Sequence, residues 1–182
     1  MISSKKDLQA YLTADMAFFY RQTKHERTMN HLTGDTAYWI AKYVRFLRKE
    51  EYYANVRKGP LGKIGALFYL TRKNKLGNKL GFRIPRNCFG PGLSIYHHGC
   101  IIVNESARIG ANCCLHGNNC IGNNGKTDEN PTIGDDLDLG FGAVIIGSVT
   151  LGNRVKVGAN ATVVCGFAED DITLTGTPAI KK

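Results

Sequence analysis

The stretch "PTIGDDLDLGFGAVIIGSVTLGNRVKVGANATVV", residues 131–164, carries an aliphatic residue at every sixth position. Neither a helix nor an ordinary strand has this period. Glycine directly follows four of the aliphatic residues. The pattern predicts short strands joined by tight glycine corners, with each coil stacked on the one before. The six aliphatic positions are Ile133, Leu139, Ile145, Leu151, Val157 and Val163.

The same period extends upstream through Ile109, Leu115 and Ile121. In such a stack each coil buries the aliphatic residues of its neighbour, so the core runs along one axis and its ends need to be covered. We therefore expect one β-helical domain over residues 81–182. The remaining residues, 1–80, are expected to form a separate helical region.

Residues 4–57 have a helical pattern, and Ser4–Asp7 fits a capping box at its start. Gly59-Pro60 is expected to end the helical run. Residues 61–80 are basic and amphipathic. A peripheral contact with a membrane surface is conceivable for such a segment, but we expect it to pack onto the rest of the protein.

Composition limits the classes of function. Hydrophobic residues make up 43% of the chain and charged residues 21%, as in a globular protein. No apolar run is long enough to span a bilayer, and the first residues do not resemble a signal peptide, so a cytoplasmic location is expected. The six cysteines form no CxxC pair; we expect small buried residues, with neither disulfides nor a metal site.

The net charge of +9 is concentrated in the first half of the chain. Residues 1–90 contain 18 Lys and Arg against 6 Asp and Glu, whereas residues 91–182 contain 6 against 9. A basic half can attract an anionic ligand, a membrane or nucleic acid, but a solvated helical face is the commoner explanation. Because no nucleic-acid-binding motif is present, no nucleic-acid partner is expected.

The repeat is first interrupted between Ile121 and Ile133, where Thr127 occupies the next expected aliphatic position. Eight polar, turn-forming residues, 123–130, cannot form a coil edge and are expected to leave the stack as a loop. Loops on a rigid scaffold often carry function. A neutral surface insertion is the alternative.

A second interruption contains two adjacent histidines, His97 and His98. Ile95 and Val103 are eight residues apart instead of six, so two extra residues lie between them. A bulge of this kind can turn side chains outward beside an active site. Since a neutral imidazole can take a proton from a hydroxyl as it attacks a carbonyl, we expect the histidines to serve catalysis rather than packing.

These features resemble the hexapeptide-repeat acyltransferases, and within them the serine acetyltransferases, especially short relatives associated with capsule and exopolysaccharide biosynthesis. The resemblance implies an α+β fold, with an N-terminal helical region followed by a left-handed parallel β-helix, and usually a homotrimer. The segments that carry it are SKKDLQAYLTAD (residues 4–15), GFRIPRNCFGPGLSIYHHG (81–99), GKTDENPTIG (125–134) and GTPAI (176–180).

The resemblance further implies an acetyl-CoA-dependent O-acetyltransferase without a metal. It places His97 as the general base that activates the acceptor hydroxyl for direct attack. Phe141 and Ala159 fall where the family contacts acetyl-CoA through backbone atoms. Further small residues would let an extended pantetheine chain lie close to the protein: Gly140, Gly142, Ala143 and Gly158.

Four positions differ from the serine acetyltransferase pattern. Phe82 stands where the family has an aspartate paired with the catalytic histidine, and Tyr96 stands where it has an amino-acid-binding aspartate. Glu129 and Asn130 replace an arginine–histidine pair that holds serine. Without that arginine a serine carboxylate lacks its bidentate partner.

We therefore expect the acceptor to be a small molecule with a hydroxyl, namely a sugar or polysaccharide precursor. Tyr96 would stack on the sugar ring, and His98, His116 and Asn130 would form hydrogen bonds with it. L-Serine is the alternative acceptor. The family's C-terminal tail, which binds a partner sulfhydrylase, is missing, so no sulfhydrylase complex is expected.

Two other classes of function remain open. The segment CCLHGNNCIG (residues 113–122) resembles part of the γ-class carbonic anhydrases, but Ala111 occupies the position of another required histidine, and a catalytic zinc needs three protein ligands. A non-catalytic scaffold or ligand-binding protein is the second alternative, because no acidic partner for His97 is evident.

Overall fold

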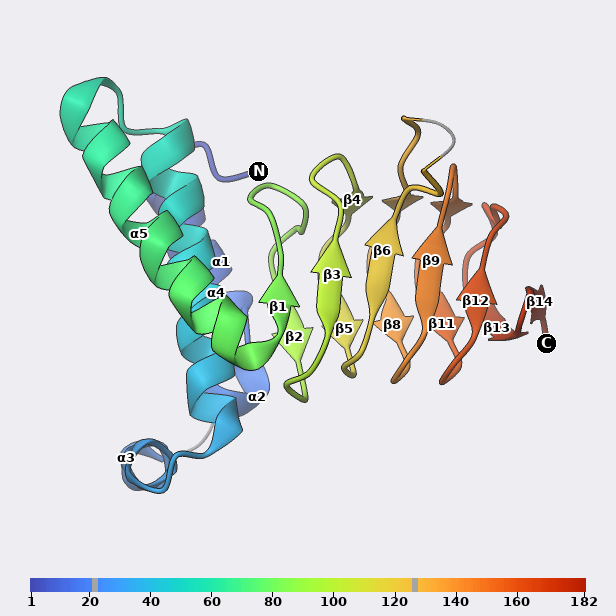
Figure 1. Ribbon diagram of the computed structural model, residues 1–182, viewed down its shortest axis with the longest axis horizontal. Helices are drawn as coiled ribbons and strands as arrows, with labels where there is room; N and C mark the ends of the chain where they lie inside the picture. The colour runs from blue at the N-terminus through green and yellow to red at the C-terminus, as the bar shows by residue number, and fades with distance from the viewer. Residues whose placement is uncertain (21–22, 126–127) are drawn as a thin grey trace.

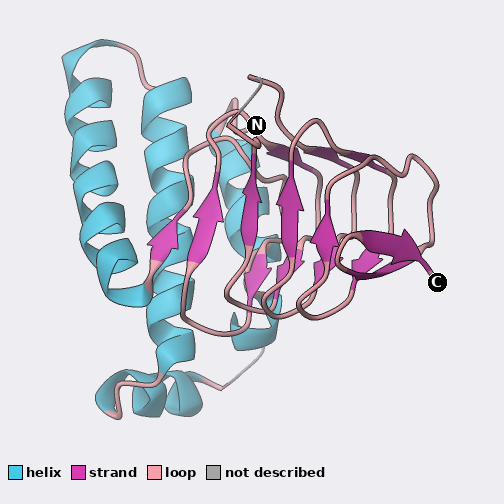
Figure 2. Ribbon diagram, turned by 45° about the vertical axis from the view of Figure 1, so that its right-hand side comes forward, coloured by secondary structure: helices cyan, strands magenta, loops and turns pink. Residues whose placement is uncertain are grey.

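The computed structural model describes residues 1–20, 23–125 and 128–182. Its helices lie at one end of an elongated prism of short strands, and the C-terminus lies at the other end (Figure 1). Figure 2 shows that the helices cover only that one end of the prism. The helices are α1 (Lys5–Ala14), α2 (Ala17–Tyr20), α3 (Lys24–Leu32), α4 (Thr36–Asn55) and α5 (Gly59–Leu80).

The predicted helical run over residues 4–57 is divided into α1 to α4. The Ser4 hydroxyl accepts the Asp7 N–H at 3.0 Å, and the Asp7 carboxylate accepts the Ser3 N–H at 2.9 Å, so the expected cap at Ser4 is present. Gly59-Pro60 does follow the end of α4, but it also begins α5. Proline fits there because the first turn of a helix leaves its N–H groups unpaired.

Three parallel sheets form the faces of the prism. Face A contains β1 (Phe82–Arg83), β3 (Ile101–Val103), β6 (Cys120–Gly122), β9 (Val144–Ile146) and β12 (Thr162–Val163). Face B contains β4 (Arg108–Ile109), β7 (Thr132–Ile133) and β10 (Thr150–Leu151). Face C contains β2 (Ser94–Ile95), β5 (Cys114–Leu115), β8 (Asp138–Leu139), β11 (Lys156–Val157), β13 (Thr173–Gly176) and β14 (Ala179–Lys181). Only the pairing of β13 with β14 is antiparallel among the strand pairs of the described residues.

The prism is a left-handed parallel β-helix. In Figure 1 the strands of face A rise at the front, and the chain crosses the top to face B behind them. It returns through face C to the next strand of face A, one coil further from the helices. Seen from the helical end, the chain therefore turns counterclockwise as it moves away, which confirms the expected handedness.

The strand register confirms the six-residue repeat. All nine predicted aliphatic positions are buried. Ile133 pairs with Leu151, eighteen residues later, so one coil takes three six-residue steps. Ile95 pairs with the residue twenty positions on, Leu115, which confirms the two extra residues in that coil.

The cysteine prediction holds only in part. All six cysteines are free, and Cys88 and Cys113 are buried. Burial raises the pKa of the Cys88 thiol to about 11 and raises that of Cys113 as well. Cys114 and Cys120 are half-buried, and Cys100 and Cys165 are exposed, so the expectation of burial was wrong for these four.

A buried arginine joins the helices to the first coil of the prism. Arg48 of α4 is fully buried and forms ion pairs with Asp15 at 2.7 Å and Glu51 at 3.1 Å. It also donates to the carbonyls of residues 89 and 90, at 3.0 and 2.7 Å. Asp15 accepts the N–H groups of residues 92 and 93, both at 2.9 Å. The network thus fixes the segment that leads into β2.

Two further contacts hold β1 against the helices. The buried Lys73 of α5 pairs with Glu50 of α4 at 2.7 Å and donates to the Ile84 carbonyl at 3.0 Å. The Tyr43 hydroxyl accepts the Ile84 N–H at 3.3 Å, and burial raises the pKa of Tyr43.

Among the described helices, none has the length and apolar composition needed to cross a bilayer.

Replacing Arg48 with Met should destabilise the protein strongly. The substitution leaves Asp15 and Glu51 buried without their cation, and breaking a buried pair from one side costs about 3–5 kcal/mol. Urea unfolding followed by circular dichroism measures the change. The matched control is Arg154→Gln, which removes an arginine whose partners, Asp170 and Asp171, are exposed; it should shift the midpoint far less. Equal shifts for the two variants would contradict the central role of Arg48.

Candidate functional site

The two histidines lie on the corner that joins β2 of face C to β3 of face A. This corner is held at both ends: the Tyr96 N–H donates to a carbonyl of β5 at 3.0 Å, and the Gly99 N–H donates to the last residue of α5 at 2.9 Å. The side chains of His97 and His98 are both exposed. The extra residues therefore turn the histidines outward, as the sequence predicted.

Gly117, in the next coil, lies directly beside His97. Its φ is +119°, and a Cβ at this position would lie 3.4 Å from the His97 Cβ and 3.2 Å from the Phe141 ring. The Gly117 N–H donates to Oδ1 of the buried Asn119 at 2.9 Å, and Asn119 Nδ2 donates to the Gly140 carbonyl at 2.8 Å. His97 and Phe141 thus flank one glycine whose position is fixed by a buried amide.

A histidine–aspartate pair lies on the outer side of face C, next to this corner. His116 Nε2 lies 2.8 Å from Asp138 Oδ1, and the Tyr96 ring lies 5.0 Å from the His116 ring, centroid to centroid. The nearby Cys114 raises the pKa of the Tyr96 hydroxyl, through its charge when ionised, and partial burial adds to the effect. Burial in turn raises the pKa of Cys114.

Asp138 was not predicted as a site residue. It reaches His116 because Leu115 pairs with Leu139, which is twenty-four residues later and thus one coil plus six residues away. Asp138 could have been found from the pairing of Leu115 with Leu139. Side chains alternate between the two faces of a strand, so the neighbours of these two buried residues, His116 and Asp138, lie on the same outer face. Using that pairing requires knowing that the loop at 123–130 lies outside the stack.

Most predicted cofactor positions lie in what we call the corner column. This is the stack of corners that follow the face C strands, residues 96–100, 116–119, 140–143 and 158–161. It brings His97, His116, Phe141 and Ala159 to one edge of the prism. Among the described residues, the N–H groups of Phe141 and Ala159 have no protein acceptor.

The small residues of the column are required by coil stacking. A Cβ at Gly140 would lie 2.7 Å from the Ala159 nitrogen, and one at Gly158 would lie 3.1 Å from the Thr175 side chain. Gly142 has a φ of +72°, which favours glycine. Ala143 is fully buried, so its side chain faces the interior and does not line a groove.

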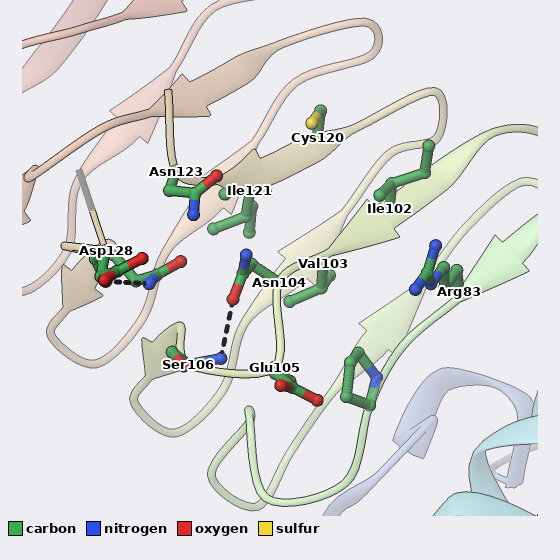
Figure 3. A pocket seen from close by; sticks show the side chains of 13 residues that line it. Arg83, Ile102, Val103, Asn104, Glu105, Ser106, Cys120, Ile121, Asn123 and Asp128 are labelled. Carbon is green, nitrogen blue, oxygen red and sulfur yellow. Dashed lines mark hydrogen bonds between the residues drawn. The ribbon is translucent and has the colours of Figure 1, made fainter. Parts of the chain in front are cut away.

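The loop at residues 123–130, which we call the excursion loop, borders an open concavity (Figure 3). This concavity lies toward the edge of face A opposite the His97 corner. The concavity has a volume of about 620 Å³, with Arg83 on one side and Asp128 on the other. Asn130 also lines it. Asn130 Nδ2 donates to the Asp128 carbonyl at 2.7 Å, and Asn130 Oδ1 is buried with no donor among the described residues. Residues 126–127 of the predicted loop, which include Thr127, lie outside the described residues.

A single chain does not bring all predicted acceptor residues together. The corner with His97 precedes β3, whereas the segment with Asn130 follows β6, at the other end of the face A strands (Figure 1). Tyr96, His97 and His116 share one edge of the prism, and His98 follows in the same corner. Asn130 lies at another edge, so the prediction of one joint acceptor site is wrong for one chain.

Position 82, where the family resemblance places the aspartate that pairs with the catalytic histidine, is a phenylalanine. Phe82 is buried and packs edge-on against the Tyr43 ring at 5.2 Å, while the next residue, Arg83, points into the concavity. His97 forms no hydrogen bond or ion pair with any residue that the structure describes. Over the same residues, no three His, Cys, Asp or Glu side chains form a group that could hold a metal ion.

Comparison with known proteins extends this description. The chain is 30% identical over 91 residues to a serine acetyltransferase of Synechococcus elongatus, covering 49% of this chain and 37% of that protein. It is 34% identical over 77 residues to a serine acetyltransferase of Helicobacter pylori, covering 41% and 45%. The chain is homologous to the serine acetyltransferases. No family model matches it.

This serine acetyltransferase homologue spans less than half the length of those curated relatives. Solved structures agree with the fold over nearly the whole chain. A serine acetyltransferase from Brucella abortus superposes with a TM-score of 0.72 at 17% identity, covering 98% of this chain and 70% of that one. A serine acetyltransferase in complex with CoA superposes with a TM-score of 0.63 at 21% identity, covering 79% and 57%.

Replacing Gly117 with Ala should disturb the His97 corner. The new Cβ would press on His97 and Phe141, and a φ of +119° is strained for alanine. Gly34→Ala is the matched control, because Gly34 also has a positive φ, +75°, but nothing lies within 4 Å of its Cβ position. We expect Gly34→Ala to cost about 1 kcal/mol and Gly117→Ala clearly more. Thermal unfolding measures both, and the His97 imidazole signals in NMR should shift only in Gly117→Ala.

Proposed function

We propose that the protein is an acetyl-CoA-dependent O-acetyltransferase in which His97 is the general base. The observation that carries the proposal is the corner column. It places an exposed histidine in the same stack of corners as Phe141 and Ala159, whose backbone N–H groups have no acceptor in the part of the chain that the structure describes. The homology to serine acetyltransferases supports the same chemistry, with a cytoplasmic location as the working assumption.

In this reaction the neutral His97 imidazole takes the proton of the acceptor hydroxyl as its oxygen attacks the thioester carbonyl. The new C–O bond forms and the C–S bond breaks, so the acetyl group moves to the oxygen. The CoA thiolate leaves and takes up the proton from the imidazolium. No metal takes part in this scheme.

The corner column is the proposed groove for acetyl-CoA. Phe141 and Ala159 lie one coil apart, and their N–H groups would donate to the amide carbonyls of an extended pantetheine chain. Phe141, an exposed aromatic residue beside Gly117, would place the thioester next to His97. Gly140, Gly142 and Gly158 have no side chains to project from this edge. The coils can therefore stack tightly, and the pantetheine chain can lie close to the backbone.

The names of the relatives favour L-serine as the acceptor over the sugar expected from the sequence. These relatives and solved structures are named serine acetyltransferases, and none of those names refers to polysaccharides. A sugar hydroxyl remains the second candidate because of one observation. Tyr96 presents an exposed ring beside His97, where the family resemblance places an amino-acid-binding aspartate.

We further propose that the functional form is a homotrimer. The concavity beside the loop has no histidine among its lining residues, and the His97 corner lacks the loop residues Asp128 and Asn130. Contact between subunits would bring the loop of one chain to the His97 corner of another. The exposed Ile102 on the outer side of face A supplies an apolar residue for such a contact.

Substitution of His97 tests the base. His97→Ala should lower kcat by roughly 10²–10⁴-fold, because no other group then accepts the hydroxyl proton, while the Kd for CoA stays unchanged. His98→Ala is the matched control on the same corner, and its effect should be much smaller. Loss of thioester absorbance is the readout, since Cys100 is exposed only three residues from His97 and would react with a thiol reagent. Near-normal turnover in His97→Ala would exclude this residue as the base.

A comparison of acceptors tests the substrate class. Acetyl-CoA consumption should occur with L-serine and be absent with nucleotide-linked sugars and oligosaccharides. The reverse result would establish the sugar as acceptor and assign Tyr96 to it. CoA binding by calorimetry without turnover on any acceptor, or no CoA binding at all, would favour the non-catalytic scaffold.

A further inference from the structure

We propose that the outer face of α5 binds the surface of an anionic phospholipid membrane. By outer face we mean Leu61, Ile64, Leu67 and Phe68 together with the neighbouring cations Lys63, Arg72 and Lys75. Only the exposure and charge of this helix support membrane binding, so the experiments that test it do not depend on whether the protein transfers acetyl groups.

The apolar residues of this face have no cover. Leu61 is 79% exposed, Ile64 64%, Leu67 62% and Phe68 49%. Their spacing of three, four and seven residues places them along one side of the helix. Exposed apolar residues gathered on one face are typical of a binding surface, whereas scattered ones are not.

The opposite side of α5 is already occupied by α4. Gly65 lies against the Tyr53 ring, Gly77 approaches Tyr43, and Leu80 is buried. In Figure 1 α5 is the outermost helix, and it reaches the prism only at its C-terminal end. The expectation that this segment packs onto the protein is therefore confirmed for one side of the helix and wrong for the other.

The charges around this face are almost all positive. Between residues 36 and 104 the chain has thirteen Lys and Arg and only two acids, Glu50 and Glu51. Both acids are buried, and they pair with Lys73 and Arg48. The surface of α4 and α5 thus presents cations without any exposed carboxylate, and each cation near an anionic bilayer adds to the attraction.

Apolar and cationic groups meet in the same place. A hollow of about 290 Å³ is lined by Ile64, Leu67, Phe68, Thr71, Arg72 and Lys75. The Arg72 guanidinium lies 5.0 Å from the centre of the Phe68 ring. A helix that combines an apolar strip with Lys and Arg lies in the membrane interface, with its apolar side chains among the acyl chains and its cations at the headgroups.

The charge argues against the other occupants. A second copy of the chain that met this face symmetrically would bring like charges together. Nucleic acid would satisfy the cations but leave the apolar strip uncovered, because it is bound mainly through its phosphates. An anionic lipid surface satisfies both groups.

Vesicle co-sedimentation of the full chain tests the proposal. The vesicles are phosphatidylcholine alone and an equimolar mixture with phosphatidylglycerol. We expect binding only to the mixture, weakened by salt. The variant Lys63→Gln/Arg72→Gln/Lys75→Gln should lower the partition coefficient on the order of 100-fold, at about 1 kcal/mol per cation. Ile64→Ser/Phe68→Ser should also abolish binding, and Phe68→Trp should give a blue-shifted emission with the mixed vesicles.

Matched controls carry the same changes elsewhere. Lys5→Gln/Lys6→Gln/Lys182→Gln removes the same charge, and Val164→Ser/Ile180→Ser removes two exposed apolar residues from the prism; both should bind like the unaltered chain. No binding to the mixed vesicles, or equal binding to both vesicles, would overturn the proposal. If light scattering shows that Ile64→Ser/Phe68→Ser loses its oligomeric state, the face binds another copy of the chain, and the proposal is wrong. If the chain binds single-stranded DNA and Ile64→Ser/Phe68→Ser binds it equally well, the face binds nucleic acid, and the proposal is also wrong.

Discussion

The guanidinium of Arg48 holds together the two parts of this protein. A charge without access to water is stable only when its partners surround it, and here two carboxylates and two backbone carbonyls do so. Those carbonyls belong to the segment that enters β2, and Asp15 fixes the residues that follow. The helical cap and the segment that begins the first coil therefore share one set of buried hydrogen bonds. The open end of the β-helix is closed by polar contacts as much as by apolar packing.

The β-helix could be predicted from the sequence because its rule is local. Each six-residue step needs one inward aliphatic residue and a corner, and a deviation in the count shows directly where a corner is longer. The boundaries between the helices could not be predicted in this way. Helix α1 ends because Asp15 and Met16 turn toward residues 92 and 93, and the Met16 N–H donates to the Leu93 carbonyl at 3.0 Å. Such a contact joins positions too distant in the chain for any periodic pattern to reveal.

The candidate site, like the fold, could be predicted from the sequence only in part. The outward position of His97 and its place in one column with Phe141 follow from counting residues along the repeat. The pairing of His116 with Asp138 depends on the register across the excursion loop. The position of Asn130 depends on which edge of the prism that loop leaves. The His116–Asp138 pairing and the position of Asn130 both depend on the three-dimensional arrangement of the coils. The family resemblance placed Asn130 beside His97 but did not indicate whether the same chain supplies both residues.

The excursion loop adds six residues to one coil, yet the ladder on both sides of it keeps its pairing: Ile121 faces Ile145, and Ile133 faces Leu151. A length change at a corner is thus absorbed where it occurs and is not passed to the next coil. The scaffold can exchange this loop for one of another length or composition while the histidine corner stays in place. In evolution, as in design, the choice of acceptor and the chemistry of transfer can therefore change separately.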